Sequence, residues 1–210
     1  SDIYSRVTSI TIPEGTTEIA NNAFNGCSNV TNITIPDSVS SIESSAFIGC
    51  TSLTGIAIPE SLTSIGEKAF SSCSSLTTMT IPQNVLTIGE RAFENCSSLT
   101  SIIIDYGLPV IGDYAFSSCP ALRSIVIPNS VASIGQYAFS GCTTLTSVTV
   151  PDSVSSIGAY SFRACSSLQD FSLPSSLTTI QNNAFEDCTA LTSIVIPENI
   201  SSIGGEIFNR

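Results

Sequence analysis

The apolar residues of this chain recur with a period of 23 residues. In the unit that runs from Cys27 to Gly49, apolar side chains stand at unit positions 4, 7, 9, 13, 16, 20 and 21. The same positions are mostly apolar in the other units, and position 16 is Ile in every unit from Ile19 to Ile203. Because the columns recur without an insertion, we expect them to stack into one continuous core, as in a solenoid.

Each unit contains the pattern of one short strand. The stretch from Leu53 to Ile58 ends in alternation of apolar and other residues, which is typical of a strand buried on one face. A Pro usually follows and stops the strand ladder, because it lacks an amide hydrogen. The second half of each unit, such as residues 62–70, is expected to run extended and to close through a short 3₁₀ or helical turn. Its glycine, Gly66 in this unit, is expected to adopt a backbone conformation that other residues avoid.

These elements predict one β-rich solenoid domain over residues 1–210, with one parallel sheet on its concave face. Extended segments and short 3₁₀ or helical turns are expected on the convex face. The period gives nine units, which begin at residues 4, 27, 50, 73, 96, 119, 142, 165 and 188. Tyr4 stands where the later units have Cys, and we identify no clear capping segment. Uncapped ends would allow identical copies to stack head to tail, which gives self-assembly into filaments as one functional hypothesis.

The repeated unit, L-x-x-I-x-I-P-x-x-V-x-x-I-G-x-x-A-F-x-x-C, is matched at nearly every place by residues 76–96. It resembles the BspA-like, or Treponema-type, class of leucine-rich repeats over essentially the whole chain. The resemblance implies an α/β horseshoe-type leucine-rich-repeat fold. Proteins of this class are mostly surface or secreted proteins of bacteria and some parasitic protists, implicated in adhesion to host or matrix proteins. The resemblance therefore implies a non-enzymatic protein-binding or adhesion module at a cell surface or in a secreted protein.

The cysteines occupy the same position in successive units. Stacked neighbours lie within disulfide range at Cα, but their parallel side chains disfavour the disulfide torsion. Metal sites need closely spaced, converging ligands, and a column with a period of 23 and no His provides none. We predict buried free thiols at Cys27, Cys50, Cys73, Cys96, Cys119, Cys142, Cys165 and Cys188.

Charge and composition disfavour several classes of function. The net charge of −11, with only six Lys and Arg residues, disfavours nucleic acid as a partner. No apolar run is long enough to cross a bilayer, so membrane insertion is not expected, and Ser1 to Arg6 do not resemble a signal peptide. Without His, and with carboxylates scattered over solvated positions, the chain is predicted to be no enzyme and to need no cofactor.

The outward strand positions are mostly Ser and Thr, with breaks at Ala57, Ile103, Val126, Asp170 and Val195, and the breaks are adjacent in the fifth and sixth units. There Ile103 and Val126 are expected to lie side by side on the surface, and Arg123 replaces the usual Thr. Asp105 and Tyr106 also replace the Pro-containing turn of the other units. Exposed apolar residues beside an Arg are typical of a contact patch, so we predict a binding site for a protein, or alternatively a glycan. Drift of one repeat would produce the same substitutions.

A second candidate surface is a column of tyrosines on the expected convex side, formed by Tyr114, Tyr137 and Tyr160 in three successive units. These rings either cover the turns or contact another chain.

Overall fold

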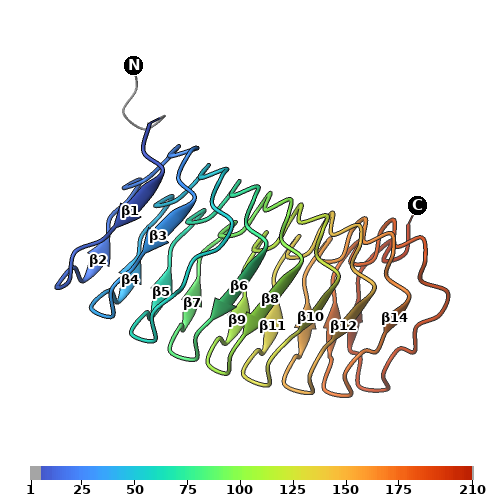
Figure 1. Ribbon diagram of the computed structural model, residues 1–210. Coiled ribbons are helices and arrows are strands. Elements are labelled where there is room, and N and C mark those ends of the chain that lie inside the picture. The colour runs from blue at the N-terminus through green and yellow to red at the C-terminus, as the bar shows by residue number, and fades with distance from the viewer. Residues whose placement is uncertain (1–5, 210) are drawn as a thin grey trace.

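The computed structural model describes residues 6–209, so Tyr4, the expected start of the first unit, lies outside the described residues. The chain forms a parallel-strand β-solenoid whose coils stack along one axis, with the low residue numbers at one end (Figure 1). Paired residues in neighbouring coils are 23 positions apart, as for Ile10 with Ile33 and Ile42 with Ile65. The sequence period is therefore the length of one coil.

A first row of strands is built from the predicted alternating stretches. The first and third residues of a strand face solvent and the second and fourth face the core, as in Thr78–Ile81, where Thr78 and Thr80 are exposed and Met79 and Ile81 are buried. The row consists of β1 (Ser9–Thr11), β3 (Asn32–Thr34), β6 (Thr78–Ile81), β8 (Ser101–Ile104), β10 (Ser124–Val126), β12 (Ser147–Thr149) and β14 (Asp170–Phe171).

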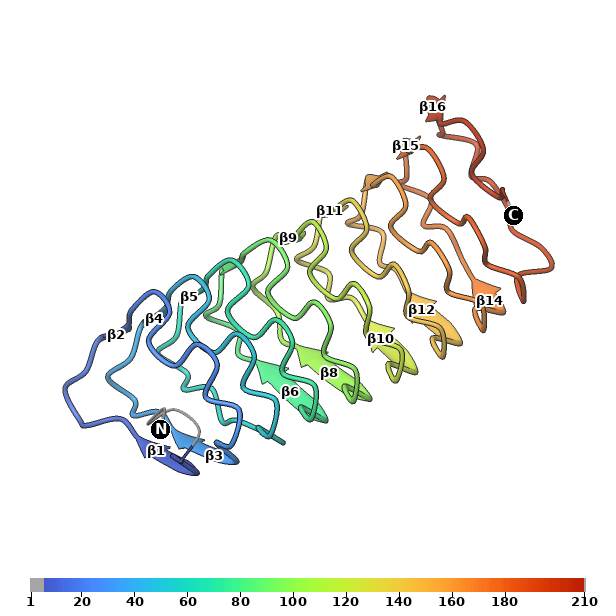
Figure 2. The same ribbon diagram turned by 90° about the horizontal axis from the view of Figure 1, so that it is seen from above.

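The second halves of the units also pair, so the prediction of a single parallel sheet was incomplete. They form a second row of two-residue parallel strands along the opposite side of the coils (Figure 2). This row consists of β2 (Glu18–Ile19), β4 (Ser41–Ile42), β5 (Ser64–Ile65), β7 (Thr87–Ile88), β9 (Val110–Ile111), β11 (Ser133–Ile134), β13 (Ser156–Ile157), β15 (Thr179–Ile180) and β16 (Ser202–Ile203).

The core between the two rows is a set of stacked side-chain columns. The Phe column is continuous from Phe24 to Phe208, with neighbouring ring centroids 5.2 to 5.9 Å apart. The Leu, Ile, Ala and Cys columns are almost entirely buried beside it. Each coil thus buries its apolar face mainly against its neighbours, which is how a short repeat that lacks its own core becomes stable.

The turn segments that close each coil contain no helix within residues 6–209, so the prediction of 3₁₀ or helical turns was wrong. In residues 45–50 the amides alternate in direction. Those of Ser45, Phe47 and Gly49 donate to carbonyl oxygens of the next coil at 2.8 to 2.9 Å, while the amides between them donate three residues back. Ser45 and Gly49 have positive φ, 58° and 72°. A helix needs consecutive local bonds, and here every second amide is used between coils.

The glycine of the second half also has a different role from the one predicted. Gly66 is not among the residues with positive φ, so its backbone is one that other residues can adopt. A Cβ atom at this position would lie 2.6 Å from backbone atoms of Glu43 and Ser44 in the preceding coil. The absence of a side chain is required for close approach of two backbones and not for an unusual conformation.

Ser and Thr hydroxyls add a second set of hydrogen bonds between coils. In three columns the hydroxyl donates to the carbonyl oxygen 23 residues earlier, at 3.0 to 3.5 Å. The donors are Thr31, Thr77, Thr100 and Thr146 in one column, Ser40, Thr63, Ser155, Thr178 and Ser201 in the second, and Thr51, Ser74, Ser97, Ser166 and Thr189 in the third. These hydroxyl ladders give the high Ser and Thr content a structural purpose.

The first strand row is interrupted at the third unit, between β3 and β6, and both rows are interrupted beside the fifth unit, at different places. In the first row β8 pairs with β6 but not with β10, and in the second row β9 pairs with β11 but not with β7. Pro109 explains the second break. The residues at its column position on either side, Leu86 and Ala132, donate to the preceding coil at 2.9 and 2.8 Å, and Pro109 has no amide hydrogen to donate. The fifth unit is thus joined to the N-terminal coils through the first row and to the C-terminal coils through the second.

Candidate functional site

The predicted contact patch lies at the break in the first strand row. Strand alternation buries Ile102 and Ile125 and turns Ile103 and Val126 outward, where their side chains are 56% and 67% exposed. Between β8 and β10, which do not pair with each other, is a hollow of about 300 Å³ whose lining includes Ile103, Val126 and Pro128. The structure therefore brings the two apolar residues together around a shallow depression.

Arg123 lies at the start of the same strand segment and is exposed. It occupies a hydroxyl-ladder position, so the carbonyl oxygen of Thr100 receives no hydroxyl bond and accepts only a long backbone bond from Arg123, at 3.5 Å. No ion pair of Arg123 is present within residues 6–209. Its guanidinium is available to a partner.

Asp105 and Tyr106 lie in the turn that leads from the first row to the second, which we call the edge turn. The Asp105 amide donates to the Ile81 carbonyl oxygen at 3.0 Å, and Tyr106 is 69% exposed. The turn is held close to the preceding coil, because a Cβ atom on Gly107 would collide with the Gln83 carbonyl oxygen. The edge turn therefore presents Tyr106 from a fixed backbone.

The sequence interpretation missed three apolar surface residues on the other row. Leu86 and Val110 are 55% and 42% exposed, and Pro109, which follows Leu86 in its column and precedes Val110 in the chain, is exposed as well. All three stand in columns that otherwise hold Ser, Thr or Glu, apart from Ala132. The signal in the sequence was the replacement of polar residues by apolar ones in these two columns of the second half of the unit.

The hydroxyl ladders are interrupted in the same region. Leu86, Pro109 and Ala132 replace hydroxyl residues in one column, Arg123 in another and Pro120 in the third. Elsewhere in the three columns of residues 6–209, Gln169 is the one further replacement. In the fourth to sixth units, exposed apolar residues therefore occur together with lost inter-coil hydrogen bonds, whereas in the last unit Val195 and Ile203 are exposed beside intact ladder bonds of Thr189 and Ser201.

The tyrosines of the second candidate surface form a stack. Tyr137 lies between Tyr114 and Tyr160, with ring centroids 4.7 Å from each and planes within 8°. The guanidinium of Arg91 covers the outer face of Tyr114 at 4.3 Å from its centroid, a cation–π contact. Both faces of Tyr114 and Tyr137 are therefore covered, so these two rings present their edges and hydroxyl groups to a partner.

All eight cysteines are buried and none forms a disulfide. From Cys50 to Cys188 each Sγ donates to a Phe carbonyl oxygen 26 residues earlier, at 3.1 to 3.3 Å. Burial raises the pKa of Cys50, Cys96, Cys142 and Cys188 to about 12, against the ordinary value of 9.0. A thiol of this pKa stays protonated and is a poor nucleophile at neutral pH.

Within residues 6–209, no group of three or more His, Cys, Asp and Glu side chains is arranged to hold a metal ion. No helix of that part of the chain has the length and apolar character needed to cross a membrane.

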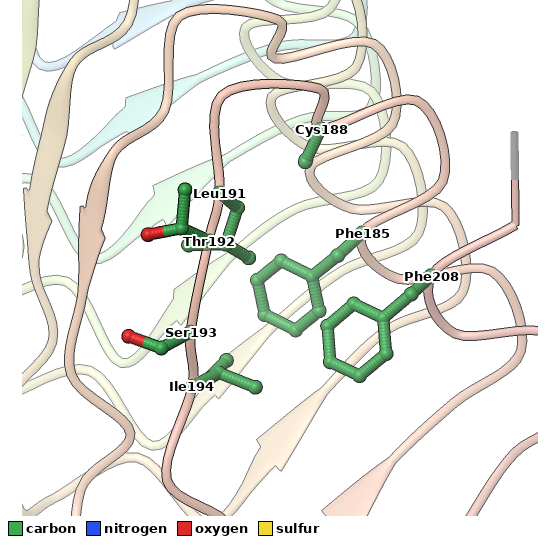
Figure 3. Close-up of a pocket in the computed structure, with 7 residues that line it drawn as sticks. All are labelled: Phe185, Cys188, Leu191, Thr192, Ser193, Ile194 and Phe208. Atoms are coloured by element: carbon green, nitrogen blue, oxygen red, sulfur yellow. The ribbon is translucent and has the colours of Figure 1, made fainter.

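An apolar hollow of about 290 Å³ lies beside the last Phe pair (Figure 3). Phe185 and Phe208 form one wall, Leu191 and Ile194 lie on the segment opposite, and Cys188 lies at the turn between the two sides. One further coil would cover it, whether from a continuing chain or from a second copy. The hollow therefore does not favour the head-to-tail hypothesis.

One protein-family model matches almost the whole chain. The model described as "BspA type Leucine rich repeat region (6 copies)" matches residues 3–123 and 109–210. The chain belongs to the BspA-type leucine-rich repeat family. Among proteins of curated function, none matches the sequence significantly.

Solved structures of bacterial leucine-rich repeat proteins share the fold. A leucine-rich repeat protein of Treponema pallidum is 26% identical, with a TM-score of 0.53, over 89% of this chain and 65% of that one. A leucine-rich repeat protein of Eubacterium ventriosum is 21% identical, with a TM-score of 0.55, over 98% of this chain and 83% of that one. This chain thus spans less than two thirds of the Treponema protein.

Proposed function

We propose that this chain is a protein-interaction module of a surface or secreted protein, and that it binds a protein through the patch on the fifth and sixth units. The BspA-type family is in general a non-enzymatic repeat scaffold that mediates protein interactions. The proposal adds to this the location of the site and its role in adhesion.

The observation that carries the proposal is the coincidence of exposed apolar residues with lost hydrogen bonds. Ile103 and Val126 stand where the same face carries Thr80 and Thr149, and Arg123 stands where a Thr would donate to the preceding coil. Each missing bond costs about 0.5–1.5 kcal/mol of stability. Substitutions that weaken the solenoid and expose apolar surface fit a binding role, because functional sites are where stabilising local rules are broken.

The test uses the complete 210-residue chain, immobilised and presented with a phage-displayed library of random 12-residue peptides. The matched variant is Ile103→Thr with Val126→Thr, which restores the residue type of the neighbouring coils and leaves the charge unchanged. The control is Thr80→Ser with Thr149→Ser, on the same face beside the patch. We expect peptides enriched on the wild type to bind the control and to lose at least tenfold in affinity for the restored variant. Absence of enriched peptides, or equal binding to all three chains, would refute the proposal.

A further inference from the structure

The apolar surface of the fifth unit continues around the edge of the solenoid. In sequence, residues 103–110 run from β8 through the edge turn to β9 and so pass from one strand row to the other. Along this path the side chains of Ile103, Tyr106 and Val110 are exposed. Neighbouring coils add Val126 on the first row and Leu86 on the second. We call these residues, together with the exposed Pro109, the apolar belt.

The edge beside the belt carries negative charge. In the column of the edge turn that contains Tyr106, the adjacent coils carry the uncharged Gln83 and Asn129, and exposed carboxylates begin two coils away on each side: Glu14, Asp37, Glu60, Asp152 and Glu198. Asp105 adds a carboxylate next to Tyr106. Within the described part of the chain this column contains no Lys or Arg.

Three of the five Lys and Arg side chains within residues 6–209 are paired with carboxylates away from the edge turns. Lys68, Arg91 and Arg163 lie in the turn segments, where their nitrogens are 2.7 to 2.9 Å from carboxylate oxygens of Glu67, Glu90 and Glu186. Arg123 lies before β10, whereas the edge turn of that coil follows the strand. The charge of the edge is therefore not balanced within its own turns.

Resting on the proposed function, we infer that the apolar belt docks a cationic protein segment that wraps the edge. Its apolar or aromatic side chains cover the belt, and its Lys and Arg residues face the edge carboxylates. A second copy of this chain is a poor occupant, because it brings the same acidic edge and a net charge of −11. Polar rims of opposite charge around an apolar centre are the usual composition of such interfaces.

The experiment extends the peptide selection with a second charge-neutral variant, Leu86→Thr with Val110→Thr. Its control is Thr178→Ser with Thr179→Ser, which lie in the same two columns outside the belt. We expect enriched peptides to carry more Lys and Arg than Asp and Glu around an apolar residue. We also expect their affinity to fall at least fivefold for the second-row variant, but not for its control, and to fall again between 50 and 500 mM NaCl.

Two outcomes overturn the inference and leave the proposed function standing. One is a set of peptides without cationic excess that still requires Ile103 and Val126. The other is equal affinity for the wild type and the second-row variant, since a peptide held by charge alone would bind both. A selection that enriches no peptide would refute both the inference and the proposed function.

Discussion

The backbone amide of Arg123 lies 3.5 Å from the carbonyl oxygen of Thr100, whereas Thr146, one coil later, donates to Arg123 at 2.9 Å. The Thr146 hydroxyl also donates to the same oxygen, at 3.2 Å. The coil that carries Arg123 is therefore attached more weakly to the coil before it than to the coil after it. The weak junction lies beside the proposed binding patch.

Restoring the missing hydroxyl should strengthen this junction. We expect Arg123→Thr to raise the free energy of unfolding by about 0.5–1 kcal/mol, through a new bond to the Thr100 carbonyl oxygen. The urea midpoint followed by circular dichroism measures the change. Arg123→Val, which has a similar shape but no hydroxyl, is the control and should not share the gain. A midpoint that is unchanged or lower in Arg123→Thr would contradict the role given to the hydroxyl ladders.

Gly107 should be intolerant of even a methyl group. A Cβ atom there collides with the Gln83 carbonyl oxygen, whereas at Gly55 a Cβ atom meets nothing within 4 Å. We expect Gly107→Ala to lower the unfolding free energy by about 1–3 kcal/mol, because backbone must move to relieve the clash. Gly55→Ala is the matched control and should be nearly neutral in the same urea titration. Equal midpoints for the two variants would show that the edge turn is not held against the preceding coil.

The Phe column should be the main source of stability per residue. Phe116 is fully buried and stacks on Phe93 and Phe139, with centroids at 5.4 and 5.6 Å. Phe116→Ala should cost about 3–5 kcal/mol, from lost burial and the cavity that remains. Tyr106→Ala, which removes an exposed ring, should change the unfolding free energy by less than about 0.5 kcal/mol. Comparable losses in both variants would be inconsistent with the described packing.

The buried thiols should make stability depend on pH above 9. Burial raises the pKa of Cys96 and Cys142 to about 12, whereas an exposed thiol has a pKa of 9.0. Between these values unfolding releases protons, so stability is fully present below pH 9 and falls as the pH rises. The loss is about 1.4 kcal/mol per pH unit for each such thiol.

Urea midpoints at pH 7, 8, 9 and 10 test the thiol prediction, with Cys96→Ala as the variant that should show a shallower fall. At pH 8 a thiol reagent should react with the cysteines in denaturant and leave the folded chain unmodified. A constant midpoint from pH 8 to 10, or rapid labelling of the folded chain, would contradict the buried environment.

Much of the solenoid could be predicted from its columns. The period of 23 residues placed the strand of the first row and the core positions, because Ile, Leu and Phe at fixed places have only one way to be buried in every coil. The same columns identified the BspA-type family. The outward alternation also located Ile103 and Val126 on the surface, although their role in binding remains a proposal.

The turn segments and the second row could not be predicted in the same way. A helical turn and an inter-coil turn place Ala46 and Phe47 in the core alike, and the difference lies in which backbone carbonyl each amide reaches. Backbone contacts between coils also determine why Gly66 is needed. Leu86 and Val110 were missed because the second half was not expected to form a strand, so its outward positions were not compared.

The offset between the two breaks gives the fifth unit a mechanical property. Its strand β8 is bonded to β6 of the preceding coil, and its strand β9 is bonded to β11 of the following coil. The fifth unit therefore connects the coils on its two sides through different strand rows. The Phe column and the turn segments run through this unit without interruption, with Phe93 and Phe116 donating to the following coils at 2.9 and 2.8 Å. Bending at this unit would therefore separate the coils at one strand row at a time, while the Phe column and the turn segments stay connected. A force along the solenoid axis would not meet both breaks at the same boundary between coils, because the β8–β10 break and the β7–β9 break lie on opposite sides of the fifth unit.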